Sequence, residues 1–267
     1  MARLSLIPSK DEFAYFKNNG AYINAGIKRL IGDIAPTAAR ILNQPIPHNW
    51  SDIANRMRIP VVPNNITLKF DGMQGDWAVK QASVVLMNYP LGYRVSEEHA
   101  LNDMEYVCYS FSPDHFGVHL TYRLLEYSVV NTRDGPAMTW SIYAISEAQL
   151  QESGCASYTY LLRSAAPYLR RLFYQFCETA IDAPEDDNDS NPVFPFGLYP
   201  AFPFLTGAGG FLQVFTHGLT GMRRHHNYLY LDPILSPQIP QGVRIKGIKW
   251  QGASFDTSIQ LNITTIT

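Results

Sequence analysis

Apolar residues recur at helical spacing through most of the first 180 residues of this chain. From Ile23 they return every three or four positions, and the same spacing runs from Tyr158 to Ala180. Such a period places one apolar face along each helix. Several helices of this kind, with no strand pattern between them, predict a packed all-α array. The apolar positions of the first stretch are Ile23, Ile27, Leu30, Ile31, Ile34, Ala38, Ile41 and Leu42.

Two prolines interrupt the longest of these patterns. We expect Pro36 to kink or split the first helix and Pro167 to break the stripe that ends at Ala180, because proline lacks the amide hydrogen that a helix interior needs. The remaining helices are expected at 50–57, 79–88, 97–106 and 136–151.

The pattern changes after residue 181. Residues 182–203 are acidic and then rich in Pro and Phe, which predicts a solvated loop followed by an extended, packed segment. A glycine-rich turn at 206–210 should open a short helix through His217. From Tyr228 the apolar residues alternate with polar ones and glycines separate the runs, which predicts strands.

Composition excludes several classes of partner. Apolar residues make up 46% of the chain, charged residues 16%, and the formal net charge is −2. This composition is typical of a globular protein and gives no electrostatic basis for binding nucleic acid or an anionic membrane. No segment is long and apolar enough to span a bilayer, so neither nucleic acid nor a membrane is expected as a partner.

The cysteine and histidine spacings predict no metal and no cofactor. Cys108, Cys155 and Cys177 form no CxxC pair, and the adjacent His225 and His226 would point to opposite faces of a strand. A disulfide between Cys155 and Cys177 stays open at this stage.

Tripeptides that can accept an N-glycan (Asn-x-Ser/Thr sequons) favour a secretory route. The N-terminus lacks the apolar core of a signal peptide, so a signal is expected upstream of Met1. Asn-x-Ser/Thr tripeptides occur at Asn49, Asn65, Asn188 and Asn262.

Four segments, taken together and in order, resemble glycoside hydrolase family 65, and particularly its fungal acid trehalases. They extend over nearly the whole chain. The segments are DEFAYFKNNGAYINAGIKRLI at 11–31, VKQASVVLMNYPL at 79–91, DGPAMTWSIYAI at 134–145 and AFPFLTGAGGFLQVFTHGLTGMR at 201–223.

The resemblance implies a fold that is mainly α. The family fold has an N-terminal β-sandwich, a helical linker, an (α/α)6 barrel and a small C-terminal β-sheet. Residues 1–222 resemble only the C-terminal part of the catalytic barrel, and residues 223–267 resemble the small C-terminal β domain. We therefore expect an N-terminally truncated fragment that is inactive in isolation.

One segment departs from the family pattern. Residues 107–126 interrupt a run that would otherwise read MEYYSVVNTRDGPAMTW. Val107 and Cys108 can be encoded as GTATGT, a common start for a fungal intron. A retained intron in the gene sequence is our hypothesis, and a genuine loop insertion is the alternative. A mature transcript that still carries these codons would exclude the intron.

Glu12 inherits the role of general acid from the resemblance. Inverting glycosidases use one carboxyl group to protonate the leaving oxygen and a second to activate water, about 6.5–9.5 Å apart. Asp11-Glu12-Phe13 matches the family motif that carries the acid, although Lys10 stands where the family commonly has Pro. Without the resemblance, this acidic pair would be read as helix capping. The general base is not identified.

Lys80 and Gln81 match a family pair that contacts the sugar at the cleavage site, and both side chains can hydrogen-bond sugar hydroxyls. Ser83 stands where the family often has Asp. The structural alternative places both residues on the polar face of a helix.

The glycine-rich segment occupies the position where phosphorylases of the family bind phosphate. It supplies Thr206, Gly207, Gly209 and Gly210 as expected substrate-binding residues, because a glycine-rich loop before a helix can hold an anion or a hydroxyl. It lacks a Ser pair, which favours water over phosphate as the acceptor. It also lacks a carboxylate that could be the base.

The resemblance implies hydrolysis of α,α-trehalose to two glucose molecules with inversion, with trehalose or a related α-glucoside as the small-molecule partner. The expected location is extracellular, in the cell wall or in the vacuole. A disaccharide phosphorylase of the same family is the first alternative, and a non-catalytic carbohydrate-binding remnant is the second.

Overall fold

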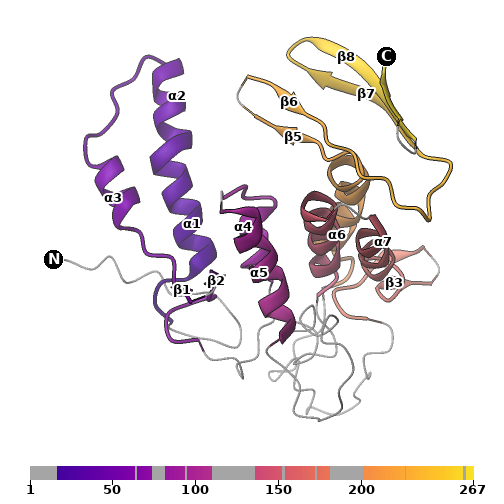
Figure 1. Cartoon of the computed structure of the whole chain (residues 1–267), viewed down its shortest axis with the longest axis horizontal. Helices are drawn as coiled ribbons and strands as arrows, with labels where there is room; N and C mark the ends of the chain where they lie inside the picture. Colours follow the sequence, from indigo (N-terminus) through magenta and orange to yellow (C-terminus); the bar gives the residue numbers. More distant parts are fainter. Residues whose placement is uncertain are drawn as a thin grey trace. The chain divides into compact units, whose positions relative to one another are not determined.

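The protein is mostly helical, with small antiparallel sheets that are most extensive near the C-terminus (Figure 1). The chain forms two compact units, residues 1–133 and 134–267. The expected division at residues 222 and 223 concerns family domains and stays a prediction. This computed structural model describes residues 17–63, 65–73, 82–93, 95–109 (105–109 as backbone), 136–151, 154–171, 173–180, 201–225, 227–260 and 263–267.

The first unit begins with a long, interrupted helix. Helix α1 (Ala21–Arg29) continues through a π-helical turn, η1 (Leu30–Ile34), into α2 (Ala35–Ile41). The predicted interruption near Pro36 is confirmed, and it takes the form of a π turn just before the proline. Pro36 lies in the first turn of α2, directly after this π turn, in which the Ala35 amide donates to the Leu30 carbonyl. The π turn is where the helical ladder adjusts to the amide hydrogen that proline lacks.

The rest of the first unit is built from shorter elements. Helices at 50–57 and 97–106 were predicted and are confirmed as α3 (Trp50–Arg56) and α5 (Glu97–Tyr109). In the described part of the predicted helix at 79–88, only the last turn is observed as helix, α4 (Val85–Asn88). Residues 79–81 lie outside the described residues. Part of the core joins Ala21 and Ala25 of α1 to Met87 of α4.

A short hairpin in the first unit was not predicted. Strands β1 (Val61–Val62) and β2 (Ile66–Thr67) pair antiparallel between α3 and α4. The expectation of helices without intervening strands is therefore wrong here. Two-residue strands leave too few positions for an alternating pattern to be visible in the sequence.

In the second unit, a buried helix lies among the other helices. Helix α6 (Met138–Leu150) packs against α7 (Gly154–Arg163) and against α8 (Leu205–Gln213), which continues into a π-helical turn, η2 (Val214–Gly218). Because neighbours cover several of its faces, α6 carries apolar and small residues on all sides. Its buried residues are Thr139, Trp140, Ser141, Ile142, Tyr143, Ala144, Ile145, Ser146 and Ala148.

The predicted break near Pro167 is confirmed, but the expected helical stripe from there to Ala180 is wrong. Helix α7 ends at Arg163, and the chain then forms the hairpin of β3 (Leu169–Arg170) and β4 (Gln175–Phe176). Tyr174, in the turn, has a positive φ of 51° and is exposed. Leu169 and Phe176, seven positions apart, have the spacing of one helix face, but in the structure they pair across the two strands.

Strands dominate the C-terminal segment, as predicted. The hairpin of β5 (Arg223–Arg224) and β6 (Leu229–Tyr230) precedes a three-stranded antiparallel sheet of β7 (Val243–Trp250), β8 (Ala253–Gln260) and β9 (Ile263–Ile266). The pairing of β7 with β8 shifts register between Ile245 and Ile248, where Gly247 has a φ of 70°. This is the positive-φ conformation that glycine adopts readily at β-bulges.

Candidate functional site

The predicted site residues divide into two groups. Glu12, Lys80 and Gln81 lie outside the described residues, so their roles stay predictions. Thr206, Gly207, Gly209 and Gly210 all lie in α8, in the second compact unit.

The glycine-rich segment is helical, which corrects the expected turn. Helix α8 begins at Leu205, after Phe204 in an extended conformation, so the whole segment from Thr206 to Gly210 is already within the helix. The first bond of its ladder is donated by the amide of Ala208 to the carbonyl of Phe204, at 3.3 Å. The amides before Ala208 have no acceptor inside the helix. Thr206 is exposed in this first turn.

Packing explains why a glycine-rich segment becomes helix here. Gly207 and Gly210 are buried against the N-terminal part of α6. A Cβ atom at position 207 would lie 2.8 Å from Ala137 Cβ, and one at position 210 would overlap the Ser141 hydroxyl. Nothing lies within 4 Å of a Cβ atom at Gly209. Two of the expected substrate-binding glycines therefore have a packing role, whereas Thr206 and Gly209 are not used in this contact.

Aromatic rings lie close to the first turn of α8: a Cβ atom at Gly207 would lie 3.1 Å from Phe204 and 3.3 Å from Phe176. Phe202 is 53% exposed, and Phe176 packs against Phe211, with 5.8 Å between ring centroids. Aromatic faces cover the apolar C–H groups of sugar rings, and exposed amides can donate to their hydroxyls. This end of α8 therefore offers the chemistry of a sugar contact, with Thr206 as its exposed hydroxyl.

His217 is a candidate functional residue that the sequence analysis did not select. It lies in η2, half-buried, with Nδ1 2.8 Å from Thr216 Oγ1, while Arg223 donates to the His217 carbonyl at 2.7 Å. Burial, followed by the charges of Arg223 and Arg224, lowers the pKa of His217. His217 lies in a π-helical turn, an element often found at functional sites, and nothing in its sequence spacing pointed to this position.

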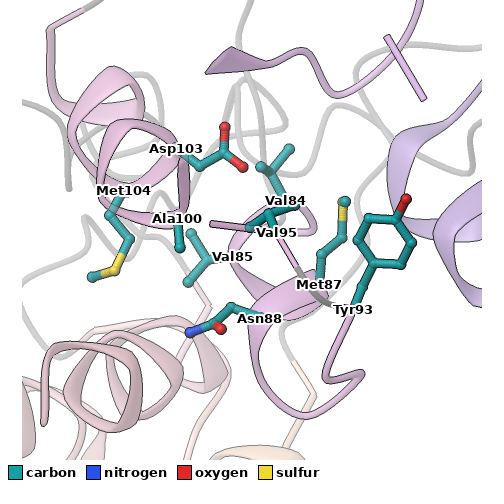
Figure 2. Close-up of a pocket in the computed structure, with 9 residues that line it drawn as sticks. All are labelled: Val84, Val85, Met87, Asn88, Tyr93, Val95, Ala100, Asp103 and Met104. Atoms are coloured by element: carbon teal, nitrogen blue, oxygen red, sulfur yellow. The ribbon is translucent and has the colours of Figure 1, made fainter. Parts of the chain in front are cut away.

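The first unit holds a small cavity between α4 and α5 (Figure 2). The volume that a water-sized sphere can occupy is about 10 Å³, roughly the lower limit for one water molecule, so this cavity is no sugar site. Asp103 is its charged residue, and burial raises the pKa of that carboxyl group to about 7. The lining residues are Val84, Val85, Met87, Asn88, Tyr93, Val95, Ala100, Asp103 and Met104.

The cysteines left open by the sequence are not joined to each other. Cys155 is exposed and Cys177 is buried, with its sulfur 3.7 Å from Thr179 Oγ1. Within the described residues, no three His, Cys, Asp or Glu side chains are grouped to hold a metal ion. His225 stacks on Tyr228 with 4.5 Å between ring centroids, and His226 lies outside the described residues. None of the described helices is long and apolar enough to cross a membrane.

Comparison with solved structures identifies the class of fold. A structure described as a candidate kojibiose phosphorylase from the human microbiome matches with a TM-score of 0.56. The match covers 96% of this chain and 34% of that one, at 12% sequence identity, and it shows a shared fold. No family model matches the chain.

Sequence relatives then identify the family. The chain is 38% identical to a periplasmic/secreted acid trehalase of Candida glabrata and 36% identical to a cell wall acid trehalase of Candida albicans, each over 96% of its length. A protein-glucosylgalactosylhydroxylysine glucosidase of Danio rerio is 30% identical over 93% of the chain. This chain is therefore a homologue of the fungal acid trehalases of glycoside hydrolase family 65. It spans 20%, 22% and 32% of the lengths of these three relatives, respectively.

Proposed function

We propose that this chain forms part of the catalytic domain of an enzyme that hydrolyses α,α-trehalose. The observation that carries the proposal is 36–38% identity to fungal acid trehalases over 96% of the chain. In this proposal residues 1–222 form the C-terminal part of an (α/α)6 barrel, and residues 223–267 form the small C-terminal β domain. The relatives that are periplasmic, secreted or in the cell wall support a secreted location.

Glu12 is the proposed general acid. Its carboxyl group donates a proton to the oxygen between the two glucose units as the bond from that oxygen to the anomeric carbon breaks. A water molecule attacks the same carbon from the opposite face and loses a proton to a second carboxylate, whose residue is unassigned. The products are two glucose molecules, one with inverted configuration.

Substrate binding is assigned to Lys80, Gln81 and the N-terminal turns of α8. Lys80 and Gln81 hydrogen-bond sugar hydroxyls. Thr206 presents a hydroxyl beside the aromatic rings described above, and Gly207 contributes a first-turn amide. Gly209 and Gly210 belong to the same proposed segment, although their amides follow Ala208 in the helical ladder. The exposure of Thr206 and Phe202 supports this assignment.

A phosphorylase is the second candidate, favoured by the fold shared with the candidate kojibiose phosphorylase. The sequence between Thr206 and Gly210 opposes it, because a phosphate site there would use a Ser pair that this segment lacks. A non-catalytic carbohydrate-binding protein is the third candidate.

A chimera tests these three candidates. In the Candida glabrata enzyme, the portion that matches this chain is replaced by the chain itself, and glucose release from trehalose is measured with and without phosphate. We expect phosphate-independent release. Turnover that requires phosphate would establish the phosphorylase instead. A folded chimera that binds trehalose in a calorimeter but releases no glucose would establish the non-catalytic candidate.

A further inference from the structure

Thr67 and Asp103 join the β1–β2 hairpin to helix α5. The backbone amide of Thr67 donates to Asp103 Oδ1 at 2.6 Å. The Thr67 hydroxyl lies 2.9 Å from His99 Nε2, and this ring nitrogen lies 3.6 Å from Asp103 Oδ2. Thr67 is 3% exposed and Asp103 6% exposed, so the amide–carboxyl contact is buried, while His99 at its edge is partly exposed. It is the polar attachment of the hairpin to the helix.

The surroundings of Asp103 are mainly apolar on its other sides. Helix α4 contributes Val85 and Met87 to the shared cavity, and the segment before α5 contributes Tyr93 and Val95 (Figure 2). Within the described residues, His99 on α5 contacts both partners of the amide–carboxyl contact and Tyr93 lines the cavity, while Lys69, two positions beyond Thr67, is also buried. Among the described residues, His99 supplies the one basic group within ion-pair distance of Asp103.

In the described part of the chain, an ionised Asp103 therefore has no charged cation at ion-pair distance at neutral pH. Burial raises the pKa of Asp103 to about 7, although the amide and hydroxyl of Thr67 act in the opposite direction. Burial also lowers the pKa of His99, so the imidazole is neutral when Asp103 loses its proton. Burial raises the pKa of Tyr93, which stays neutral throughout.

We propose that Asp103 is a proton-dependent latch, which holds the β1–β2 hairpin against α5 when the carboxyl group is protonated and releases it on ionisation. The neutral acid accepts the Thr67 amide through Oδ1 and leaves no charge in the apolar cavity. Ionisation places a charge there, and its cost is relieved when the hairpin opens and admits water.

The direction of the pH effect follows from the two titrations. The Asp103 pKa is raised above its ordinary value of 3.8, so the stabilisation is complete below about pH 4 and is lost as the pH rises towards 7. The lowered pKa of His99 acts oppositely, because keeping this ring neutral costs stability as the pH falls below 6.5. The hairpin is therefore held most firmly at weakly acidic pH and is looser above pH 7.

Hydrogen exchange of the full chain tests the latch. Protection of the peptide 61–69 is measured at pH 5.5 and pH 8 and corrected for the intrinsic exchange rate. We expect protection to fall at least about tenfold at the higher pH. In Asp103→Asn, whose amide is neutral at both pH values and keeps the acceptor for Thr67, protection should no longer fall at the higher pH, because only the opposite effect of His99 remains. Asp52→Asn is the matched control, since Asp52 is exposed and pairs with Arg56 in the same unit. This variant should retain the wild-type loss.

Two results would overturn the latch: wild-type protection that is unchanged between the two pH values, or an Asp103→Asn variant that loses protection as the wild type does. If Asp103→Asn does not fold, the latch is tested on the wild type alone, by titrating Asp103 directly. The carboxyl carbon of Asp103 is followed by NMR, and a titration midpoint near 7 is expected. A midpoint below 5 would contradict the latch.

Discussion

Gly210 of α8 packs directly against Ser141 of α6, at a position where a side chain would overlap the serine hydroxyl. The Ser141 hydroxyl is itself held by the carbonyl of Met138 at 3.0 Å, so it has little freedom to move aside. The close approach of these two helices therefore depends on the absence of a side chain at 210.

Gly210→Ala should destabilise the second unit by about 1–3 kcal/mol, because the added methyl group overpacks the contact between α6 and α8. Chemical unfolding monitored by circular dichroism measures the change. Gly209→Ala is the matched control in the same helix. With nothing within 4 Å of its new methyl group, it should be neutral or stabilise by up to about 1 kcal/mol through helix propensity. Equal effects of the two variants would refute the packing argument.

Glu12→Gln in the chimera should lower the turnover of trehalose by about 10²–10⁴-fold. Glutamine keeps the size of the side chain but cannot donate an acidic proton to the leaving oxygen. Initial rates of glucose release measure the loss, with native-like circular dichroism as the control for folding. Substantial residual activity in a folded variant would remove Glu12 from the catalytic role.

Lys80→Ala in the same chimera should raise KM and lower kcat together. The change removes charge-assisted hydrogen bonds to the sugar, each worth roughly 1.5–3 kcal/mol. Steady-state kinetics with trehalose separates the two constants. If both stay at the unsubstituted values, Lys80 lies on a solvated helix face and makes no contact with the substrate.

The 267-residue chain alone should release no glucose from trehalose at an enzymatic rate. It spans about a fifth of the length of the Candida trehalases, and an (α/α)6 barrel assembles its site from loops of all its helix pairs. Without the other loops the substrate is not positioned, and positioning supplies roughly 7–11 kcal/mol of the barrier reduction. A glucose-release assay on purified monomer is the measurement. Turnover at an ordinary enzymatic rate would require a different fold for the site.

Asn49 and Asn65 should each carry one N-glycan when the chain is secreted from yeast. Both side chains are exposed, Asn49 just before α3 and Asn65 in the turn of the β1–β2 hairpin. Asn49→Gln and Asn65→Gln should each remove one step of the mass shift produced by endoglycosidase. A mobility unchanged by either substitution would show that these sites are unused.

The sequence predicted the structure best where the pattern of apolar residues depends on a single helix or strand. The apolar period from Ile23 to Leu42 predicted the first helix, and Pro36 located its interruption within a few residues. The alternation after Tyr228 predicted the C-terminal strands. In each case the information lies within one or two turns of helix, or within one strand, and does not depend on a distant partner.

The sequence was least informative where a distant residue decides the structure. Gly210 suggested a turn because glycine is a poor helix former, and only its contact with Ser141 explains the helix. In the sequence, Asp103 could not be distinguished from an exposed aspartate on a helix. Its burial depends on contacts with Thr67 and with the cavity beside α4, which are distant in the sequence. The chemistry assigned to Glu12, Lys80 and Gln81 came from resemblance and stays a prediction.

The burial of α6 has a consequence for synthesis on the ribosome. Leu150 ends this helix, α7 follows almost at once, and Leu205 begins the helix that covers another of its faces. At about 5–20 residues per second, the interval between Leu150 and Leu205 lasts roughly 3–10 s. During that time Ser141 and its neighbours on the α8-facing side of the nascent helix have no partner. A translational pause between these two residues would lengthen the exposure and should increase the demand for chaperone binding to the α6–α7 pair.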